Sequence, residues 1–328
     1  NIRAGNTLVG FATYEEVKKA VGGQLDFDNA MEKIEIKAAD LQQTFDAFRQ
    51  RQIEGDGSVP VEHKLELRKR LKALEEELNR YLAVQYGKNP NNQQWLKSHQ
   101  PFHWFVEFYG IMKSGGFDVI IGNPPYVELS TITKKYRPKN FITEQCGNLY
   151  ALCTERSFTL QNNNSRFGFI VQQPITSTIR MTLCRQIISK YSSFIWASTY
   201  DDRPSKLFDG MHHARLAIII TKRNSLKLLT TFESSCLYVT RYNKWFKEER
   251  DYVFHKLDFI RSTTDKLLDI FPKFSTDKEI QIIDKLFKCP DKLGSWTTNN
   301  NPTYQLYYKI TGVGNWFTIT PRPPKFFR

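Results

Sequence analysis

The sequence has no apolar run of about 18 residues or more, the length that a membrane-spanning helix needs. No signal-peptide pattern is visible either. Its five cysteines are scattered without a Cys-x-x-Cys pair, and no group of His and Cys has the spacing of a zinc site. We therefore expect a cytoplasmic protein with reduced thiols, no membrane segment and no bound metal.

The chain has fewer acidic residues than basic ones. Asp and Glu number 34 against 47 Lys and Arg, which leaves a net charge of +13. An excess of positive charge favours a polyanionic partner, and nucleic acid is the usual one. A basic surface without a special function would have the same composition, so the charge alone leaves both interpretations open.

One stretch of the chain carries most of the functional information. The apolar run Phe117–Ile121 is entered through Gly115-Gly116 and is closed by Gly122. This pattern predicts a fully buried strand in the middle of a parallel sheet. Two prolines follow and cannot donate ladder hydrogen bonds, so the chain must leave the sheet at its carboxyl edge. Ligands bind at that edge in open α/β sheets.

The residues of this turn suit a planar amino-bearing substrate. Asn123 precedes a proline and is biased toward an extended backbone. Its amide oxygen and the carbonyl of Pro124 would then be two fixed acceptors for one amino group, such as the exocyclic NH2 of adenine. Tyr126 adds a flat face on which a base can stack. Such a site works by positioning and electrostatics and needs no covalent intermediate.

The motif Asn123-Pro124-Pro125-Tyr126 after an apolar strand resembles the catalytic motif of the gamma-class adenine-N6 DNA methyltransferases. The context from Phe102 to Val127 resembles the large type IIG restriction-modification methylases. The resemblance implies a site-specific, adenine-specific enzyme that transfers methyl from S-adenosylmethionine to a flipped-out base of double-stranded DNA. It also implies restriction-modification partner subunits or a fused nuclease. Methyltransferases that act on guanine N2 of RNA or on a protein glutamine carry the same four residues, so these remain alternatives.

The resemblance also assigns roles to residues outside the motif. Phe208 matches an aromatic residue that stacks on the other face of the flipped adenine, and this is the favoured interpretation; a plug in the core is the alternative. Asn6 matches a residue that contacts the cofactor adenine, whereas a plain turn asparagine explains it equally well. Asn123 is expected at the cofactor as well as at the substrate.

A basic loop follows the motif directly. It contains Lys134, Lys135, Arg137 and Lys139. Placed beside the target nucleotide, these side chains would bind the flanking phosphates of the DNA backbone. A solvated loop without a ligand is an interpretation of similar weight.

The pattern of apolar residues predicts an α/β protein. Strands are expected at 167–171, 194–198 and 216–220, with helices at 148–160 and 179–191. The family resemblance adds that the strands 194–198 and 216–220 form an antiparallel hairpin. Together they indicate a partial doubly wound, Rossmann-like methyltransferase sheet.

Apolar residues three and four apart predict a helical hairpin, packed as a coiled coil, ahead of this sheet. Its stripes are Met31, Ile34, Ala38, Leu41, Phe45 and Phe48, then Leu67, Leu71, Leu74, Leu78 and Leu82. A spacer is the favoured interpretation of the hairpin, and an arm on the DNA backbone is the other. A helix over 277–287 and a β-hairpin within 304–319 complete the expected elements.

Four domains are predicted. They are a remnant of the N-terminal half of the methyltransferase domain (1–25), the helical-hairpin insertion (26–87), the catalytic half (88–224) and the start of an α+β target-recognition region (225–328). The family's Phe-x-Gly-x-Gly turn for the methionine part of the cofactor is missing, and the first residue is not Met. We therefore expect an internal fragment of a longer protein. An inactive DNA-binding fragment without a cofactor site is the alternative from a different functional class.

Overall fold

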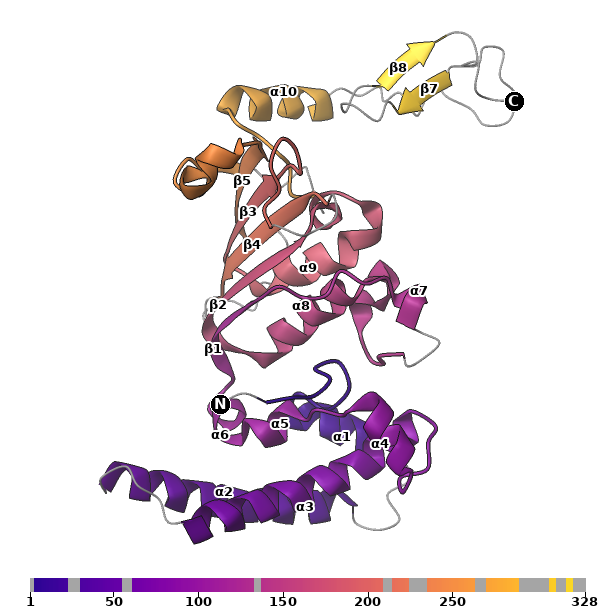
Figure 1. The fold of residues 1–328 in the computed structure, drawn as a ribbon, viewed down its shortest axis with the longest axis vertical. Helices are drawn as coiled ribbons and strands as arrows, with labels where there is room; N and C mark the ends of the chain where they lie inside the picture. The colour runs from indigo at the N-terminus through magenta and orange to yellow at the C-terminus, as the bar shows by residue number, and fades with distance from the viewer. Residues whose placement is uncertain are drawn as a thin grey trace. The chain divides into compact units, whose positions relative to one another are not determined.

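The computed structural model describes residues 3–22, 30–54, 61–132, 137–208, 214–223, 235–262, 270–288, 307–310 and 317–320. The chain divides into two compact units, residues 1–280 and 281–328. The larger unit has a helical N-terminal part followed by a mixed β-sheet (Figure 1).

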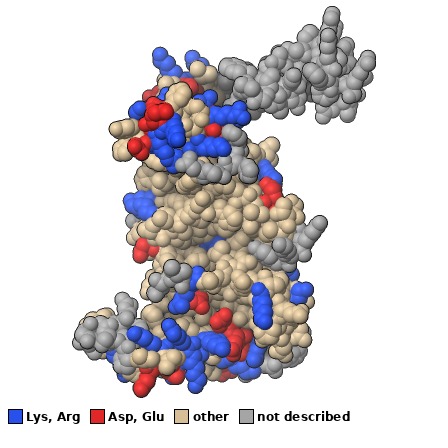
Figure 2. Space-filling model, viewed as in Figure 1, with Lys and Arg blue, Asp and Glu red and all other residues tan. Residues whose placement is uncertain are grey.

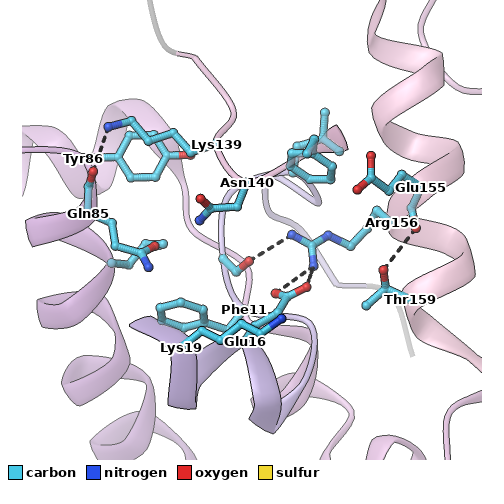
Figure 3. Close-up of a pocket in the computed structure, with 14 residues that line it drawn as sticks. Phe11, Glu16, Lys19, Gln85, Tyr86, Lys139, Asn140, Glu155, Arg156 and Thr159 are labelled. Carbon is cyan, nitrogen blue, oxygen red and sulfur yellow. Dashed lines mark hydrogen bonds and ion pairs between the residues drawn. The ribbon is translucent and has the colours of Figure 1, made fainter. Parts of the chain in front are cut away.

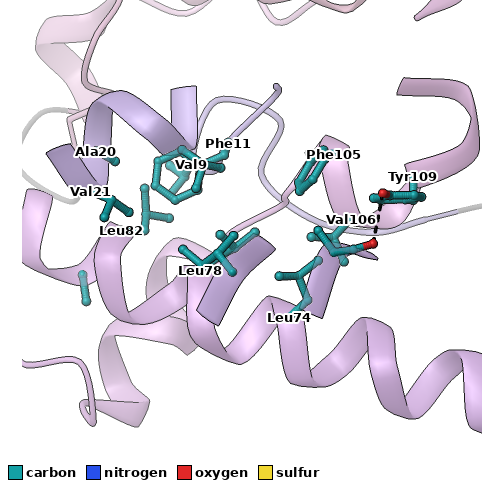
Figure 4. Packing of buried hydrophobic residues seen from close by; sticks show 14 of the residues in the cluster. Val9, Phe11, Ala20, Val21, Leu74, Leu78, Leu82, Phe105, Val106 and Tyr109 are labelled. Carbon is teal, nitrogen blue, oxygen red and sulfur yellow. Dashed lines mark hydrogen bonds between the residues drawn. The ribbon is translucent and has the colours of Figure 1, made fainter. Parts of the chain in front are cut away.

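The helical part is built around a long hairpin. Helix α2 (Ala30–Glu54) and helix α3 (Val61–Gln85) run antiparallel, because Lys37 pairs with Glu77 whereas Asp40 pairs with Arg70 further back on α3. The predicted stripes face each other in one core: Ile34, Ala38, Leu41, Leu74, Leu78 and Leu82 are buried (Figure 4). The side chains of Met31 and Phe48 lie outside the described residues. The predicted helical hairpin is thus confirmed.

The hairpin is covered by shorter helices. They are α1 (Tyr14–Gly22), α4 (Gln93–His99), α5 (Trp104–Glu107) and α6 (Tyr109–Lys113). Phe105 and Tyr109 are buried in the same core as α3, and the Tyr109 hydroxyl donates to the carbonyl of Ala38 on α2 at 3.1 Å. Trp104 instead lies edge-on to Phe117, with ring centroids 5.6 Å apart, and so connects this core to the sheet.

The sheet has six strands in the order β1-β2-β4-β3-β5-β6. They are β1 (Phe117–Gly122), β2 (Gln161–Gln172), β3 (Phe194–Tyr200), β4 (Leu216–Lys222), β5 (Cys236–Asn243) and β6 (Ile260–Ser262). Strands β1, β2, β3 and β5 share one direction, and β4 and β6 oppose it. The expected antiparallel hairpin is β3–β4. Helix α8 (Leu149–Leu160) connects β1 to β2, and α9 (Thr182–Tyr191) lies between β2 and β3. The predicted α/β class with a partial Rossmann-like sheet is therefore confirmed.

One expectation about β1 is wrong. Its apolar sequence predicted a fully buried central strand, but β1 lies at an edge of the described sheet and pairs only with β2. Val119 is 57% exposed and Ile121 is 77% exposed. A central strand needs neighbours on both sides, and no described strand lies beyond β1. The two glycines that precede β1 do have the expected role, because Gly115 and Gly116 have φ of 104° and 113°.

The C-terminal elements follow the sequence pattern. Helix α10 covers Asp277–Lys288, and strands β7 (Tyr307–Ile310) and β8 (Phe317–Thr320) pair antiparallel. The predicted helix and β-hairpin are confirmed. Strands β5 and β6 belong to the six-stranded sheet, although residues 225–328 were expected to start a separate region. The domain boundaries themselves stay predictions.

Candidate active site

The carboxyl ends of the parallel strands bring several predicted residues to one edge of the sheet. The last residue of β1 in register with β2 is Gly122, opposite Phe169. The chain then leaves the sheet through Asn123 and the two prolines. Asn123 is exposed and Pro124 is buried, so the turn is anchored by its proline while its carboxamide faces outward.

Tyr126 folds back onto the end of the sheet. Its hydroxyl lies 2.6 Å from Oδ1 of Asn123 and 3.0 Å from the carbonyl oxygen of Ile170 on β2. Burial raises the pKa of Tyr126 to about 12, so the phenol keeps its proton at neutral pH. The ring lies edge-on to Tyr150 of α8, with centroids 6.4 Å apart.

Tyr126 and Phe208 meet at one apolar cluster, although 82 positions separate them in the sequence. The buried members of this cluster are Tyr200, Leu207, Leu216, Trp245 and Val253. Tyr126 and Phe208 are both half-buried and pack against it, one from the turn after β1 and the other from the loop between β3 and β4. The two aromatic residues predicted to sandwich a base thus lie against a common support, and their stacking role stays a prediction.

Asn6 lies in a turn next to α4. Its Oδ1 accepts a hydrogen bond from the backbone N–H of Leu8 at 3.2 Å, and its own N–H donates to the carbonyl of Gln100 at 2.8 Å. It also forms an isolated bridge with Pro101. This is the geometry of a turn asparagine. Its predicted contact with a cofactor stays untested.

The predicted backbone-binding loop is only partly described. Lys134 and Lys135 lie outside the described residues. Arg137 forms an ion pair with Glu144. The ammonium of Lys139 donates to the carbonyl of Gln85 at 2.7 Å and lies 5.3 Å from the centroid of the Tyr86 ring. Lys139 is therefore engaged with the end of α3.

Lys139 also lines a pocket of about 350 Å³ between α1, the end of α3 and α8 (Figure 3). On one wall, Arg156 donates to both carboxylate oxygens of Glu16, at 2.8 and 3.0 Å, and to the carbonyl of Gly10 at 3.2 Å. Of the predicted site residues that the structure describes, Lys139 alone lines this pocket. On this wall the positive charge of Arg156 and the negative charge of Glu16 neutralise each other. The pocket lies where the helical part of the chain meets α8.

The sequence did not predict a charged cluster at the two ends of the loop that carries Phe208. Asp201, the residue after β3, is 6% exposed and lies 3.4 Å from Nε of Arg215 and 3.4 Å from Nζ of Lys244. Burial alone would raise the pKa of Asp201, but the N–H of Asp202 and these two cations lower it overall. The side chains of Arg215 and Lys244 are 50% and 63% exposed. The sequence contained one signal for this cluster: Asp201 follows β3, Arg215 precedes β4 and Lys244 follows β5.

The described residues that are expected to contact S-adenosylmethionine do not line the described pocket. Oδ1 of Asn6 is occupied by its own turn, and the 350 Å³ pocket contains neither Asn6 nor Asn123. The chain also lacks the glycine-rich turn expected for the methionine part. Within the described ranges, no group of three or more His, Cys, Asp or Glu side chains is arranged to hold a metal ion.

None of the helices in the described part of the chain combines the length and apolar composition that a membrane span requires. On the face shown in Figure 2, basic and acidic side chains are interspersed over the helical part. This mixture is typical of a solvated surface.

Comparison with known proteins gives three further findings. The chain is 33% identical over 99 residues to a Methanocaldococcus jannaschii protein whose name is that of a type II restriction enzyme and methyltransferase, which covers 30% of this chain and 8% of that protein. A chain of the DrdV–DNA complex is similar in structure to this chain, with a TM-score of 0.40 and 12% identity, over 58% of this chain and 23% of that one. The modification subunit of a type I restriction enzyme from Vibrio vulnificus YJ016 is similar at TM-score 0.34 and 12% identity, over 69% and 52%.

The assignment rests on a family model and not on these structural likenesses, which are loose. The model of the Eco57I restriction-modification methylase matches residues 25–201. This match includes the helical hairpin, the Asn123–Tyr126 turn and strand β3. Because it covers more than half of the 328 residues, the chain belongs to the Eco57I restriction-modification methylase family.

Proposed function

We propose that the complete protein containing this chain methylates N6 of adenine in double-stranded DNA, with S-adenosylmethionine as the methyl donor. The observation that carries this proposal is the exposed Asn123 at the carboxyl edge of the sheet, in contact with Tyr126, which packs against the same apolar cluster as Phe208. Membership of a restriction-modification methylase family supports DNA as the substrate. The chain spans 8% of its Methanocaldococcus relative, so the activity is assigned to the complete protein.

In this proposal the turn recognises the amino group. Oδ1 of Asn123 and the carbonyl of Pro124 accept one hydrogen bond each from the exocyclic NH2. These two bonds would direct the nitrogen lone pair away from the turn, toward the side from which a methyl donor would have to approach. The N–CH3 bond would form as the donor's S–CH3 bond breaks, and the amino group would then release one proton to solvent, so that no strong base is required. Pro125 fixes the turn because its ring restricts the backbone.

The target base must leave the duplex, because the amino group of a paired adenine is already hydrogen-bonded inside the stack. Tyr126 and Phe208 supply the two aromatic faces for the extruded base. Both rings pack against the cluster around Tyr200 and Trp245, so a rigid support exists for each. Stacking of one base on an aromatic ring contributes roughly 1–3 kcal/mol.

S-adenosylmethionine would supply the electrophilic methyl group. In this proposal the Asn123–Tyr126 turn supplies the amino-group side of the reaction. Asn6 and Asn123 remain the candidates for contact with the cofactor.

The DNA backbone would be bound by exposed cations at the same edge of the sheet. Arg215 and Lys244 lie beside the loop that carries Phe208, and the chain as a whole has a net charge of +13. Arg137 remains a candidate from the basic loop. We also propose that the complete protein works with restriction-modification partner subunits or carries a nuclease in the same polypeptide.

The test is the transfer of labelled methyl from S-adenosylmethionine to plasmid DNA by the complete protein. Asn123→Ala is expected to lower transfer by about 100-fold or more, since one preorganised contact to a reacting group is worth about that much. Asn91→Ala, at an exposed loop position, is the matched control and should retain activity.

Label on adenine N6 that persists in Asn123→Ala would remove the role given to this residue. A protein that labels RNA or a protein glutamine, and never DNA, would contradict the substrate assignment. DNA binding without transfer or cofactor binding would favour an inactive binding fragment.

A further inference from the structure

The hydroxyl of Tyr126 has more acceptors than hydrogens. It lies 2.6 Å from Oδ1 of Asn123 and 3.0 Å from the carbonyl oxygen of Ile170. A phenol has one hydrogen to donate, so it can satisfy only one of these two oxygens. The second contact would then be between two oxygens with no hydrogen between them.

The carbonyl oxygen of Ile170 is the favoured acceptor for the hydrogen of the Tyr126 hydroxyl. β1 stays in register with β2 up to Gly122, opposite Phe169, and Ile170 is the next residue of β2. A continuing strand would offer backbone N–H groups at this point. Pro124 and Pro125 have none, so the hydroxyl of Tyr126 is the donor that reaches the end of the ladder.

The carboxamide of Asn123 can resolve the remaining conflict. Its oxygen and nitrogen ends have the same shape, and the hydrogen-bond partners decide which end faces which neighbour. If the carboxamide turns by 180°, Nδ2 donates to the phenol oxygen while the phenol donates to Ile170. Both short contacts then become hydrogen bonds, and Oδ1 faces away from Tyr126.

We propose that Tyr126 is a positioning residue whose hydroxyl, anchored on the Ile170 carbonyl, holds the carboxamide of Asn123 with its oxygen turned to the substrate amino group. This inference rests on the proposed function and deepens it. The Tyr126 ring and the Tyr126 hydroxyl have separate tasks, because the ring supports the base and the hydroxyl sets the direction of the acceptor. The substrate class that fits is a planar group with a free NH2. An amide nitrogen turned outward would repel such a group.

Tyr126→Phe separates the two tasks, because it keeps the ring and removes the hydroxyl. The expected result is a fall in kcat of about 10- to 100-fold, typical of a misplaced reacting group, with KM for DNA changed less than about twofold. Extrusion of the target base, followed by 2-aminopurine fluorescence, should persist. In an Asn123→Ala background the same change should have little further effect, since the hydroxyl acts through Asn123. Tyr150→Phe is the matched control: it removes one buried phenol hydroxyl, which contacts Sδ of Met181, and should leave kcat unchanged.

A second measurement does not depend on activity. In protein labelled with 15N-asparagine, the Nδ2 protons of Asn123 are identified by their loss in Asn123→Ala. One of them should exchange slowly with solvent in the wild type and rapidly in Tyr126→Phe. Equal exchange in both proteins, or an unchanged kcat in Tyr126→Phe, would overturn the proposal. If the exchange result is as expected but the wild type never methylates DNA, the positioning role stands and the DNA assignment fails.

Discussion

Arg156 of α8 forms an ion pair with Glu16 of α1, 140 positions earlier in the sequence, and one guanidinium nitrogen contacts both carboxylate oxygens. The arginine side chain is 7% exposed and the glutamate 34% exposed. The guanidinium also donates to the carbonyl of Gly10 and lies 5.1 Å from the centroid of the Phe141 ring. One buried cation therefore joins the helical part of the chain to a helix that packs on the sheet.

Arg156→Met is expected to lower the free energy of unfolding by about 3 kcal/mol, because it leaves Glu16 partly buried without its partner. The measurement is urea unfolding followed by circular dichroism. Arg137→Met is the matched control, since its pair with Glu144 is exposed and should contribute less than about 1 kcal/mol. Equal losses in the two variants would show that burial does not set the strength of the first pair.

His103 is expected to make the fold sensitive to acid. Its Nδ1 accepts from the N–H of Phe11 at 3.1 Å, and its Nε2 lies 3.1 Å from Oδ1 of Asn79. Burial first, and the charge of Arg156 second, lower its pKa from 6.5 to about 3. Below about pH 6.5, His103 takes up a proton in the unfolded chain but stays neutral in the folded chain. The free energy of unfolding therefore decreases as the pH falls from about 6.5 toward 3.

The expected contribution is a slope of up to about 1.4 kcal/mol per pH unit, measured as urea unfolding between pH 7 and pH 4. His103→Gln removes the titrating group and should flatten the curve over this range, even if it is less stable at pH 7. If the wild type and this variant lose stability in parallel, other groups govern the acid sensitivity.

Phe208 is expected to act through its flat ring. Phe208→Ala should weaken binding of the extruded base by about 1–3 kcal/mol, measured with 2-aminopurine at the target position. Phe208→Leu and Phe208→Tyr distinguish stacking from core packing. A stacking residue tolerates Tyr and not Leu. Activity that survives in Leu and fails in Ala would identify Phe208 as a plug of the cluster around Leu207.

Arg215 and Lys244 are expected to contact phosphates. Arg215→Ala and Lys244→Ala should each weaken DNA binding similarly for all sequences and reduce the slope of log K against log salt by about 1. Lys72→Ala on the helical hairpin, where the side chain is 75% exposed, is the control and should leave the slope unchanged. An unchanged slope in the first two variants would confine these cations to their role around Asp201.

Local patterns were enough to predict most elements. The stripe from Ile34 to Leu41 and the stripe from Leu74 to Leu82 predict two helices that bury one face each, since side chains three and four apart share a face. The strands at Phe167, Phe194 and Leu216 follow from short apolar runs between breakers. The Asn123–Tyr126 turn follows from two prolines, whose geometry hardly depends on distant residues.

Tertiary structure decided what no local pattern could. The sequence of β1 is as apolar as that of a central strand, yet Val119 and Ile121 are exposed, because burial depends on which strands lie beside it. The cluster of Asp201, Arg215 and Lys244 arises because β3 and β5 end, and the antiparallel β4 begins, at one edge of the sheet. The same packing brings the Tyr126 hydroxyl to Asn123 and Ile170. The sequence by itself determined which residues could form a site for an amino group, and the order of the strands determined which of them meet, because hydrogen bonds and ion pairs act over a few ångströms and not along the chain.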